Sequence, residues 1–413
     1  IEDNEAFENG NHGFIISRGC NNFVFRRNKS YDNHYTISND ERNAHGFMLD
    51  PGSPNSQFPQ VASHDNLLED NQAWGNDGYG LRVVGSTTNT IQRNTFTGGL
   101  QGITLEQGSS GNIVQDNTLT GSMIYGIYLI GGSDDNTIQR NTITGSGKHG
   151  IYFKTAKNTI SNNTVTNNGT IINGVPSGSG IASYADGDPA MAIADLQLPG
   201  AAVNVAAIDP ALLGAQAQVS AITGNLISGN SVLNNADKGI ELKSANGTHV
   251  KSNTISGNGT HGIYLSSGAS NSLIDLNTIN ANKGQGIRVN GLDVAGNQWS
   301  KNLVYDNLIG GIVLTSGANN GTPAPTVDQD GKTVTITTQP GAMVEIYSDD
   351  SGQGRFFEAR IKATSDTITL TRSWKGAKVN ATATDTEGNS SGFAFNRGMF
   401  TGSYFISIPL IRK

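Results

Sequence analysis

The chain has 413 residues and a formal net charge of −7, from 27 lysines and arginines against 34 aspartates and glutamates. This balance argues against general nucleic-acid binding, and no apolar run approaches membrane-spanning length. The single cysteine, Cys20, excludes an internal disulfide framework. Low charge together with abundant Asn, Gly, Thr and Ser is typical of an extracellular or periplasmic β-solenoid.

A repeat organises the chain from its first residues to about residue 316. The run GITL at 102–105 recurs as GIYL at 126–129, and most such steps are 22 to 25 residues long. Apolar residues alternate with polar ones over three to five positions and are followed by Gly, Asn, Asp or Ser, a pattern of strands closed by turns. Three short strands per fixed period predict a right-handed parallel β-helix of about eleven coils, an all-β fold.

Each coil repeats the same local chemistry. The residues one and three after each register glycine, such as Ile103 and Leu105, are apolar and are predicted to point into the solenoid. The glycine permits a backbone corner that a side chain would obstruct. An asparagine at the next corner is predicted to adopt the left-handed conformation and to bond with asparagines of neighbouring coils.

Two insertions interrupt the repeat, near 34–65 and near 170–223. The second is rich in Ala and Leu and is broken by Pro199 and Pro210, so we expect short helices in it. Insertions of this kind lie on the working face of a solenoid or are neutral surface excursions.

The repeat stops after Gly317, and a linker-like stretch, NNGTPAP, follows at 319–325. Alternating strands separated by Gly, Asp and Ser turns then predict a small antiparallel β-sandwich, Ig-like, over 325–395. We expect few contacts to cross the proline-containing linker. The tail at 396–413 ends in an apolar strand with a basic tip, which either pairs with the sandwich or serves as a sorting signal.

One face of the predicted solenoid carries polar and aromatic side chains in register. Positions two and four after each glycine should point outward, about 4.8 Å apart from coil to coil. Aromatic rings stack on sugar faces and polar groups bond hydroxyls, so this column predicts an extended glycan groove; the alternative is a solvated sheet. The candidate substrate-binding residues are Ser17, Asp50, Arg82, Glu106, Tyr128, Tyr152 and Lys154.

The stretch HGFIISRGCNNFVFRRNKSYDN at 12–33 resembles the periplasmic type of alginate (mannuronan) C5-epimerases, which are right-handed parallel β-helices. The resemblance implies that Arg18 neutralises the uronate carboxylate while charge develops on loss of the C5 proton. The family's Asp-Pro-His motif would fall before Ile1, so we expect the chain to be N-terminally truncated.

Within the chain, His12, His45 and Tyr79 can supply a base or an acid, because general acid–base work favours groups that titrate near neutral pH. Histidines in a repeat column also serve packing alone.

These features predict a carbohydrate-active protein whose partner is an anionic polysaccharide, with C5-epimerisation of polymannuronate as the reaction. The alternatives are a polysaccharide lyase and a non-catalytic, adhesin-like glycan-binding solenoid. We expect a monomer and no cofactor. If a metal ion binds, the sequence favours calcium, since Asp65, Glu69 and Asp70 form an acidic cluster of hard oxygen ligands.

Overall fold

In this computed structural model the described residues are 1–34, 44–52, 58–184 and 222–394. The part of the second insertion in which we expected short helices lies largely outside the described residues. The C-terminal tail at 396–413 also lies outside them. The described part of that insertion holds an antiparallel hairpin of β20 (Thr170–Ile172) and β21 (Val175–Ser177). None of the described residues forms a helix long and apolar enough to cross a membrane.

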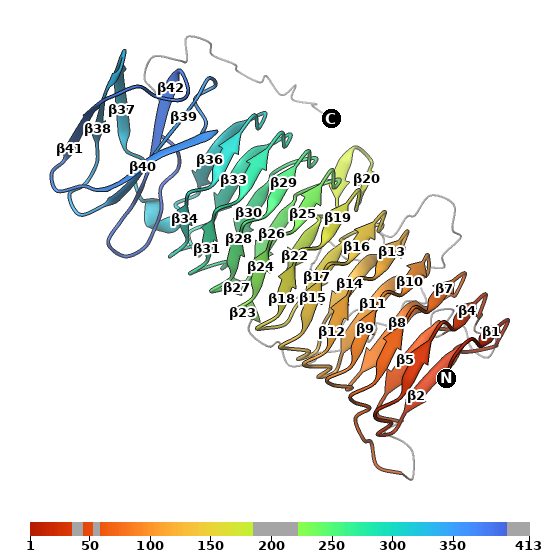
Figure 1. Cartoon of the computed structure of the whole chain (residues 1–413). Coiled ribbons are helices and arrows are strands. Elements are labelled where there is room, and N and C mark those ends of the chain that lie inside the picture. Colours follow the sequence, from red (N-terminus) through yellow and green to blue (C-terminus); the bar gives the residue numbers. More distant parts are fainter. Residues whose placement is uncertain (35–43, 53–57, 185–221, 395–413) are drawn as a thin grey trace, which may run out of the picture.

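Three parallel sheets wind along one axis and form a β-helix, as expected (Figure 1). Sheet 1 consists, in order, of β1 (Glu5–Phe7), β4 (Lys29–Tyr31), β7 (Gln72–Trp74), β10 (Thr95–Thr97), β13 (Thr118–Thr120), β16 (Thr142–Thr144), β19 (Thr164–Thr166), β25 (Ser231–Leu233), β29 (Thr254–Ser256), β32 (Thr278–Asn280) and β35 (Leu303–Tyr305).

Sheet 2, which carries the candidate site, consists of β2 (Phe14–Ser17), β5 (Phe47–Asp50), β8 (Tyr79–Val84), β11 (Gln101–Glu106), β14 (Tyr125–Leu129), β17 (Ile151–Phe153), β22 (Ile181–Ser183), β26 (Ile240–Lys243), β30 (Ile263–Ser266), β33 (Gln285–Asn290) and β36 (Gly310–Thr315). Its eleven strands confirm the eleven predicted coils.

Sheet 3 consists of β3 (Val24–Arg26), β6 (Leu67–Glu69), β9 (Thr90–Gln92), β12 (Ile113–Gln115), β15 (Thr137–Gln139), β18 (Thr159–Ser161), β24 (Leu226–Ser228), β28 (His249–Lys251), β31 (Leu273–Asp275) and β34 (Gln298–Ser300). A small extra pair is formed by β23 (Ile222–Thr223) and β27 (Ala245–Asn246).

The interior of the solenoid is one continuous apolar core. Ile103 and Leu105 of sheet 2 are fully buried, which confirms the inward columns. In the short strands of sheets 1 and 3 the middle residue fills the same core, as Leu119 does. A Cβ on Gly102 would lie 2.5 Å from Leu119 Cδ2, so the register glycine is required by close packing.

Asparagine ladders join the coils at the corners. Along the ladder that includes Asn94, Asn117 and Asn141, each backbone N–H and each side-chain NH2 donates to the Oδ1 of the next asparagine, at 2.9–3.0 Å. The prediction that the corner asparagines adopt the left-handed conformation is wrong by one residue. The left-handed residue is the one before each, such as Asp116 (φ 59°) and Arg140 (φ 54°), which leaves the asparagine free to face the ladder.

The register of the strands can be tested at two neighbouring residues of β12. Val114 is fully buried, whereas Ile113 is 38% exposed. We expect Val114→Thr to lower the free energy of unfolding by about 1–3 kcal/mol, because it buries a hydroxyl among apolar side chains. Ile113→Thr should change it by less than about 0.5 kcal/mol. Urea denaturation measures both, and a larger loss at Ile113 than at Val114 would mean that the two faces are reversed.

The C-terminal domain consists of two three-stranded antiparallel sheets that pack on each other through a separate apolar cluster. One sheet contains β37 (Thr326–Asp330), β38 (Thr333–Thr337) and β41 (Thr367–Thr371), and the other β40 (Phe356–Lys362), β39 (Met343–Asp349) and β42 (Lys378–Thr384). A short 3-10 turn, η4 (Asn319–Gly321), precedes it.

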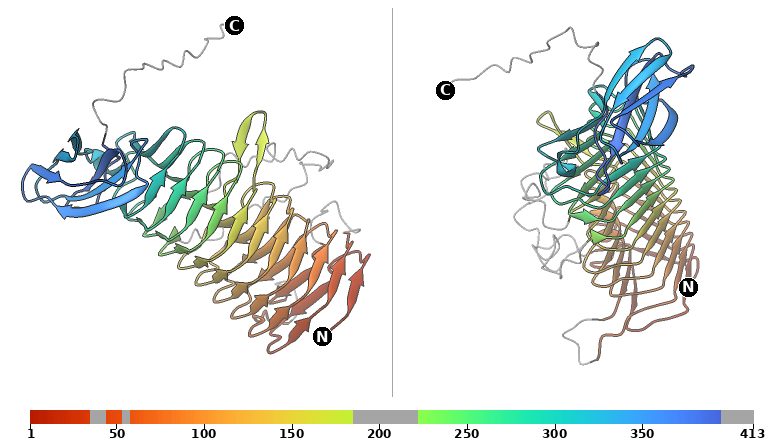
Figure 2. Two further views of the ribbon diagram at one scale, coloured as in Figure 1. Left: turned by 45° about the horizontal axis from the view of Figure 1, so that its top comes forward. Right: turned by 90° about the vertical axis from the view of Figure 1, so that its left-hand side faces the viewer.

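This domain closes the end of the β-helix, as both views of Figure 2 show. Tyr347 and Phe393 belong to the solenoid core cluster. Trp299 Nε1 donates to the Ser391 carbonyl at 2.9 Å, and the Glu345 carboxylate accepts the Lys301 N–H at 2.8 Å. The expectation that few contacts cross the linker is therefore wrong: the domain is packed onto the last coil.

Candidate functional site

The outer face of sheet 2 is organised by histidines that stand one residue before the register glycine. Nδ1 of His12 accepts the His45 N–H at 3.1 Å, and Nδ1 of His45 accepts the Tyr79 N–H at 3.0 Å. The rings of His12, His45 and Tyr79 stack at 4.6 Å. His149 and His261 make the same bond to the backbone of the next coil. The sequence-predicted trio thus lies together in one column.

These bonds set the chemistry of the imidazoles. Burial and the Arg82 guanidinium outweigh Asp50 and lower the pKa of His12 to about 4. Burial, Arg82 and His12 hold the pKa of the fully buried His45 well below its ordinary value. Since Nδ1 is an acceptor in a neutral ring, the proton is on Nε2. Each of these rings therefore presents an Nε2–H donor, and its one lone pair, on Nδ1, accepts a backbone N–H.

The same shift predicts a pH dependence of stability. The pKa of His12 and of His261 is about 4 in the folded chain against 6.5 unfolded. Between pH 4 and pH 6.5 the unfolded chain binds more protons than the folded chain. The free energy of unfolding is therefore highest above about pH 6.5 and falls as the pH drops to 4. The melting temperature against pH measures it, and His261→Gln should flatten the slope. His34→Gln, which changes an exposed side chain, should leave the slope unchanged. Equal slopes in the native protein and in both variants would contradict the assignment of the pH dependence to the buried histidines.

Arg82 and Glu106 form the second group of expected residues, next to the histidines. Arg82 Nε donates to Glu106 Oε1 at 2.7 Å, and Arg82 Nη1 lies 3.5 Å from His45 Nε2. The guanidinium carbon also lies 5.8 Å from the centre of the Tyr79 ring. Arg82 is therefore already paired with an internal carboxylate.

Arg18, Ser17 and Asp50 form a third group at the opposite end of the first strands. Ser17 pairs with Asp50 in register, and the Arg18 N–H donates to the Asp50 carbonyl at 3.1 Å. The Arg18 guanidinium lies 5.1 Å from the Phe58 ring. His12 precedes the four-residue strand β2 and Arg18 follows it, so the backbones of the two residues lie at opposite ends of this strand. The structure therefore separates two groups that the sequence analysis had joined.

The tyrosines expected to line an open groove are buried. Tyr128 is 4% and Tyr152 2% exposed, in a cluster with Tyr125 and Tyr184 on the outside of sheet 2. The half-buried Lys154 lies with its ammonium 5.6 Å from the Tyr152 ring centre. Burial raises the pKa of Tyr128 well above its ordinary value. Their assignment as exposed sugar platforms is corrected: these rings pack on one another instead.

A buried carboxylate beyond this cluster was not singled out from the sequence. Glu241 Oε2 accepts the Tyr184 hydroxyl at 2.6 Å and the Ser179 hydroxyl at 2.8 Å, and Lys238 and Lys243 lie 3.3 Å from Oε1. Burial opposes ionisation of Glu241, but the two lysines and Tyr184 lower its pKa to about 2. Such a carboxylate is a fixed charge and a poor base. The sequence signal that could have identified Glu241 is its place two residues after a register glycine.

The weak calcium candidates are engaged by other side chains. Glu69 binds Arg26 at 2.5 Å and also pairs with Arg93. Asp70 also binds Arg93, and Asp65 binds His64. In the described ranges no group of three or more His, Cys, Asp or Glu side chains is placed to hold a metal ion. The acidic cluster is an ion-pair network.

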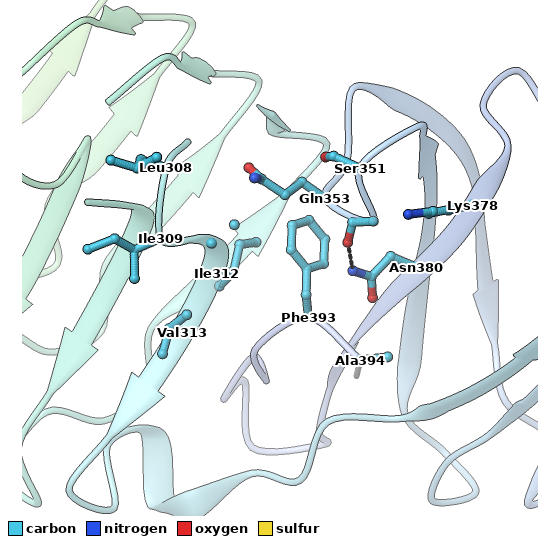
Figure 3. Close-up of a pocket in the computed structure, with 13 residues that line it drawn as sticks. Leu308, Ile309, Ile312, Val313, Ser351, Gln353, Lys378, Asn380, Phe393 and Ala394 are labelled. Atoms are coloured by element: carbon cyan, nitrogen blue, oxygen red, sulfur yellow. Dashed lines mark hydrogen bonds between the residues drawn. The ribbon is translucent and has the colours of Figure 1, made fainter. Parts of the chain in front are cut away.

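A hollow of about 330 Å³ lies where β36 meets the C-terminal domain (Figure 3). Ile309, Val313 and Phe393 form apolar walls, and Lys378 and Asn380 stand on the domain side. It contains none of the expected site residues. It lies at the other end of sheet 2 from Arg18.

Two family models match parts of the chain. Residues 52–182 match the model described as periplasmic copper-binding protein (NosD), and residues 212–324 match the right handed beta helix region. No curated protein gives a significant sequence match.

Among solved structures, the Dettilon tailspike protein is 15% identical with a TM-score of 0.50, over 95% of this chain and 83% of that one. A double mutant of the periplasmic alginate epimerase AlgG is 13% identical with a TM-score of 0.48, over 75% of each chain. The Azotobacter vinelandii mannuronan C-5 epimerase AlgE4 A-module is 12% identical with a TM-score of 0.39, over 74% and 81%. The tailspike similarity shows the β-helix fold alone.

Proposed function

We propose that this protein acts on an acidic polysaccharide held along the outer face of sheet 2, and that it epimerises uronate residues at C5, with polymannuronate as the polymer. The observation that carries the proposal is the Arg18–Asp50 group, where a cation and a carboxylate stand on successive coils at one end of sheet 2. An extracellular or periplasmic location agrees with such a substrate.

The two side chains have complementary tasks. One oxygen of Asp50 accepts the Gly52 N–H at 3.0 Å, which fixes the carboxylate, and the other oxygen is the base for the C5 proton. Loss of this proton places negative charge on the uronate carboxylate, and a planar guanidinium such as that of Arg18 stabilises it with two parallel bonds. Asp50 then releases its proton to solvent, and return of a proton from water to the opposite face completes epimerisation. Departure of the 4-linked oxygen, protonated by water, gives the lyase reaction instead.

Glycan binding without catalysis is the second candidate function, and the column of histidines on the outer face of sheet 2 favours it. The half-buried His12 and His261 carry Nε2–H groups that can bind hydroxyls, and their Nδ1 atoms take up no proton near neutral pH. Their arrangement is suited to holding sugar oxygens.

Incubation of the protein with polymannuronate in heavy water tests the proposal. We expect NMR to show deuterium entering at C5 together with inversion at that carbon. New ultraviolet absorbance from unsaturated chain ends would establish the lyase reaction instead. Binding of the polymer without exchange at C5 would establish the binding protein, and absence of binding would overturn the proposal.

A further inference from the structure

Arg288, far from Arg18 along sheet 2, occupies the same local position as Arg82. Each arginine stands two residues after a register glycine, in β33 and β8 respectively. Each has Nη1 at 3.5 Å from Nε2 of a histidine on the preceding coil, His261 for Arg288 and His45 for Arg82. Because Nδ1 of both histidines accepts a backbone N–H, Nε2 carries a proton in both pairs. Two donors then face each other, so the histidine does not satisfy the arginine in either pair.

At Arg82 the protein supplies a carboxylate for the guanidinium. Glu106, two residues beyond the register partner of Arg82, receives its Nε–H. The equivalent residue on the coil after Arg288 is Thr315, whose hydroxyl donates to Asn290 Oδ1 at 2.8 Å. Among the described residues, no carboxylate lies within 4 Å of Arg288, and its buried Nε has no hydrogen-bond partner.

The surroundings of Arg288 fit a sugar that carries a carboxylate. The buried Oε1 of Gln285 likewise has no partner within the described ranges and can accept a hydroxyl. The half-exposed ring of Tyr264 pairs with Arg288 in register and lies 6.0 Å from its guanidinium carbon. Val313, the register partner of Arg288 on the next strand, lines the hollow of about 330 Å³ (Figure 3). The hollow therefore begins on the strand next to Arg288.

We propose that Arg288, His261, Gln285 and Tyr264 form a uronate-binding subsite in which the ligand's carboxylate takes the place that Glu106 holds at Arg82. The subsite rests on the proposed function for the identity of the polymer. It lies eight strand spacings from Asp50 in sheet 2, or about 38 Å at about 4.8 Å per coil. A long chain can therefore engage both places, and a short oligomer only one.

Binding of long and short oligomannuronates to the whole protein, measured by calorimetry, tests the subsite. Arg288→Gln should weaken binding of the long oligomer about ten- to hundredfold, as expected for loss of a charged hydrogen bond. Thr315→Glu should have the same effect, because the new carboxylate pairs with Arg288. Arg140→Gln, which removes the same charge from a pair with Asp116 on another face, should bind like the native protein.

A second readout needs no ligand. Thr315→Glu should raise the melting temperature, and Thr315→Gln should not, because only the carboxylate neutralises the guanidinium. Unchanged polymer binding by Arg288→Gln would overturn the subsite and leave the proposed function standing. Equal affinity for polyglutamate would overturn the assignment to a sugar. Absence of uronate binding by the native protein would overturn the proposed function and this subsite together.

Discussion

Deletion of residues 322–413 is expected to lower the melting temperature of the β-helix by roughly 10 °C or more and to make the remaining chain aggregate. The deletion removes Tyr347 and Phe393 from the solenoid core and exposes Trp299, which is 2% exposed in the intact chain. Burial of each large apolar side chain contributes about 1.5–3 kcal/mol. Backbone donors such as the Lys301 N–H would lose their carboxylate partner. A loss of about 5 kcal/mol corresponds to a shift of this size.

Calorimetry and light scattering measure this effect, and point variants separate it from the loss of chain length. Phe393→Ala should cost about 3–5 kcal/mol by opening a cavity at the junction. Thr337→Ala, at an exposed position on the far sheet of the domain, should cost less than about 0.5 kcal/mol. A truncated chain as stable and soluble as the intact one would show that the two parts fold independently.

Arg18→Ala and Asp50→Asn are each expected to reduce turnover of polymannuronate by about a hundred- to a thousandfold. Removal of one group that stabilises the growing negative charge has effects of this size on turnover. Asp50→Asn keeps the shape of the side chain and its bond to the Gly52 N–H but removes the base. Arg18→Lys keeps the charge and loses the planar two-pronged contact, so it should fall between the native protein and Arg18→Ala.

The rate of C5 exchange by NMR at saturating polymer measures these effects. Arg27→Gln, at an exposed pair with Asp3 on the adjoining coil, is the matched control and should retain the native rate. Native rates in both Arg18→Ala and Asp50→Asn would remove the reaction from this end of sheet 2. Substitutions at Tyr128 or Tyr152 should destabilise the fold, because both rings are buried.

The repeat could be predicted because period-two alternation and glycine spacing are local properties that recur in every coil. They predicted the inward faces of Ile103 and Leu105, and they placed the histidines and Tyr79 in one column and Arg82 in another outward column. Spacing also placed His12 before and Arg18 after the same four-residue strand, but it could not show that Arg82 is paired with Glu106.

The remaining features depend on contacts across long sequence separations. Ser179 and Tyr184 reach Glu241 across the second insertion, which breaks the spacing that would have aligned them. The burial of Tyr128 and Tyr152 depends on neighbouring rings of other coils and not on their own alternation. The docking of the C-terminal domain depends on Phe393, which lies more than seventy residues beyond the last coil.

The asparagine ladders give the solenoid a direction. Each Oδ1 accepts from the coil before it, and each backbone N–H and side-chain NH2 donates to the coil after it. The last asparagine of a ladder therefore points its donors out of the C-terminal end of the solenoid. At that end Gln353 Oε1 accepts from both the N–H and the side chain of Asn307. Any module that closes this end must therefore present acceptors, and a second solenoid docked end to end in the opposite orientation would bring donor against donor. The ladder thus imposes head-to-tail order on any lengthening of this protein by added coils.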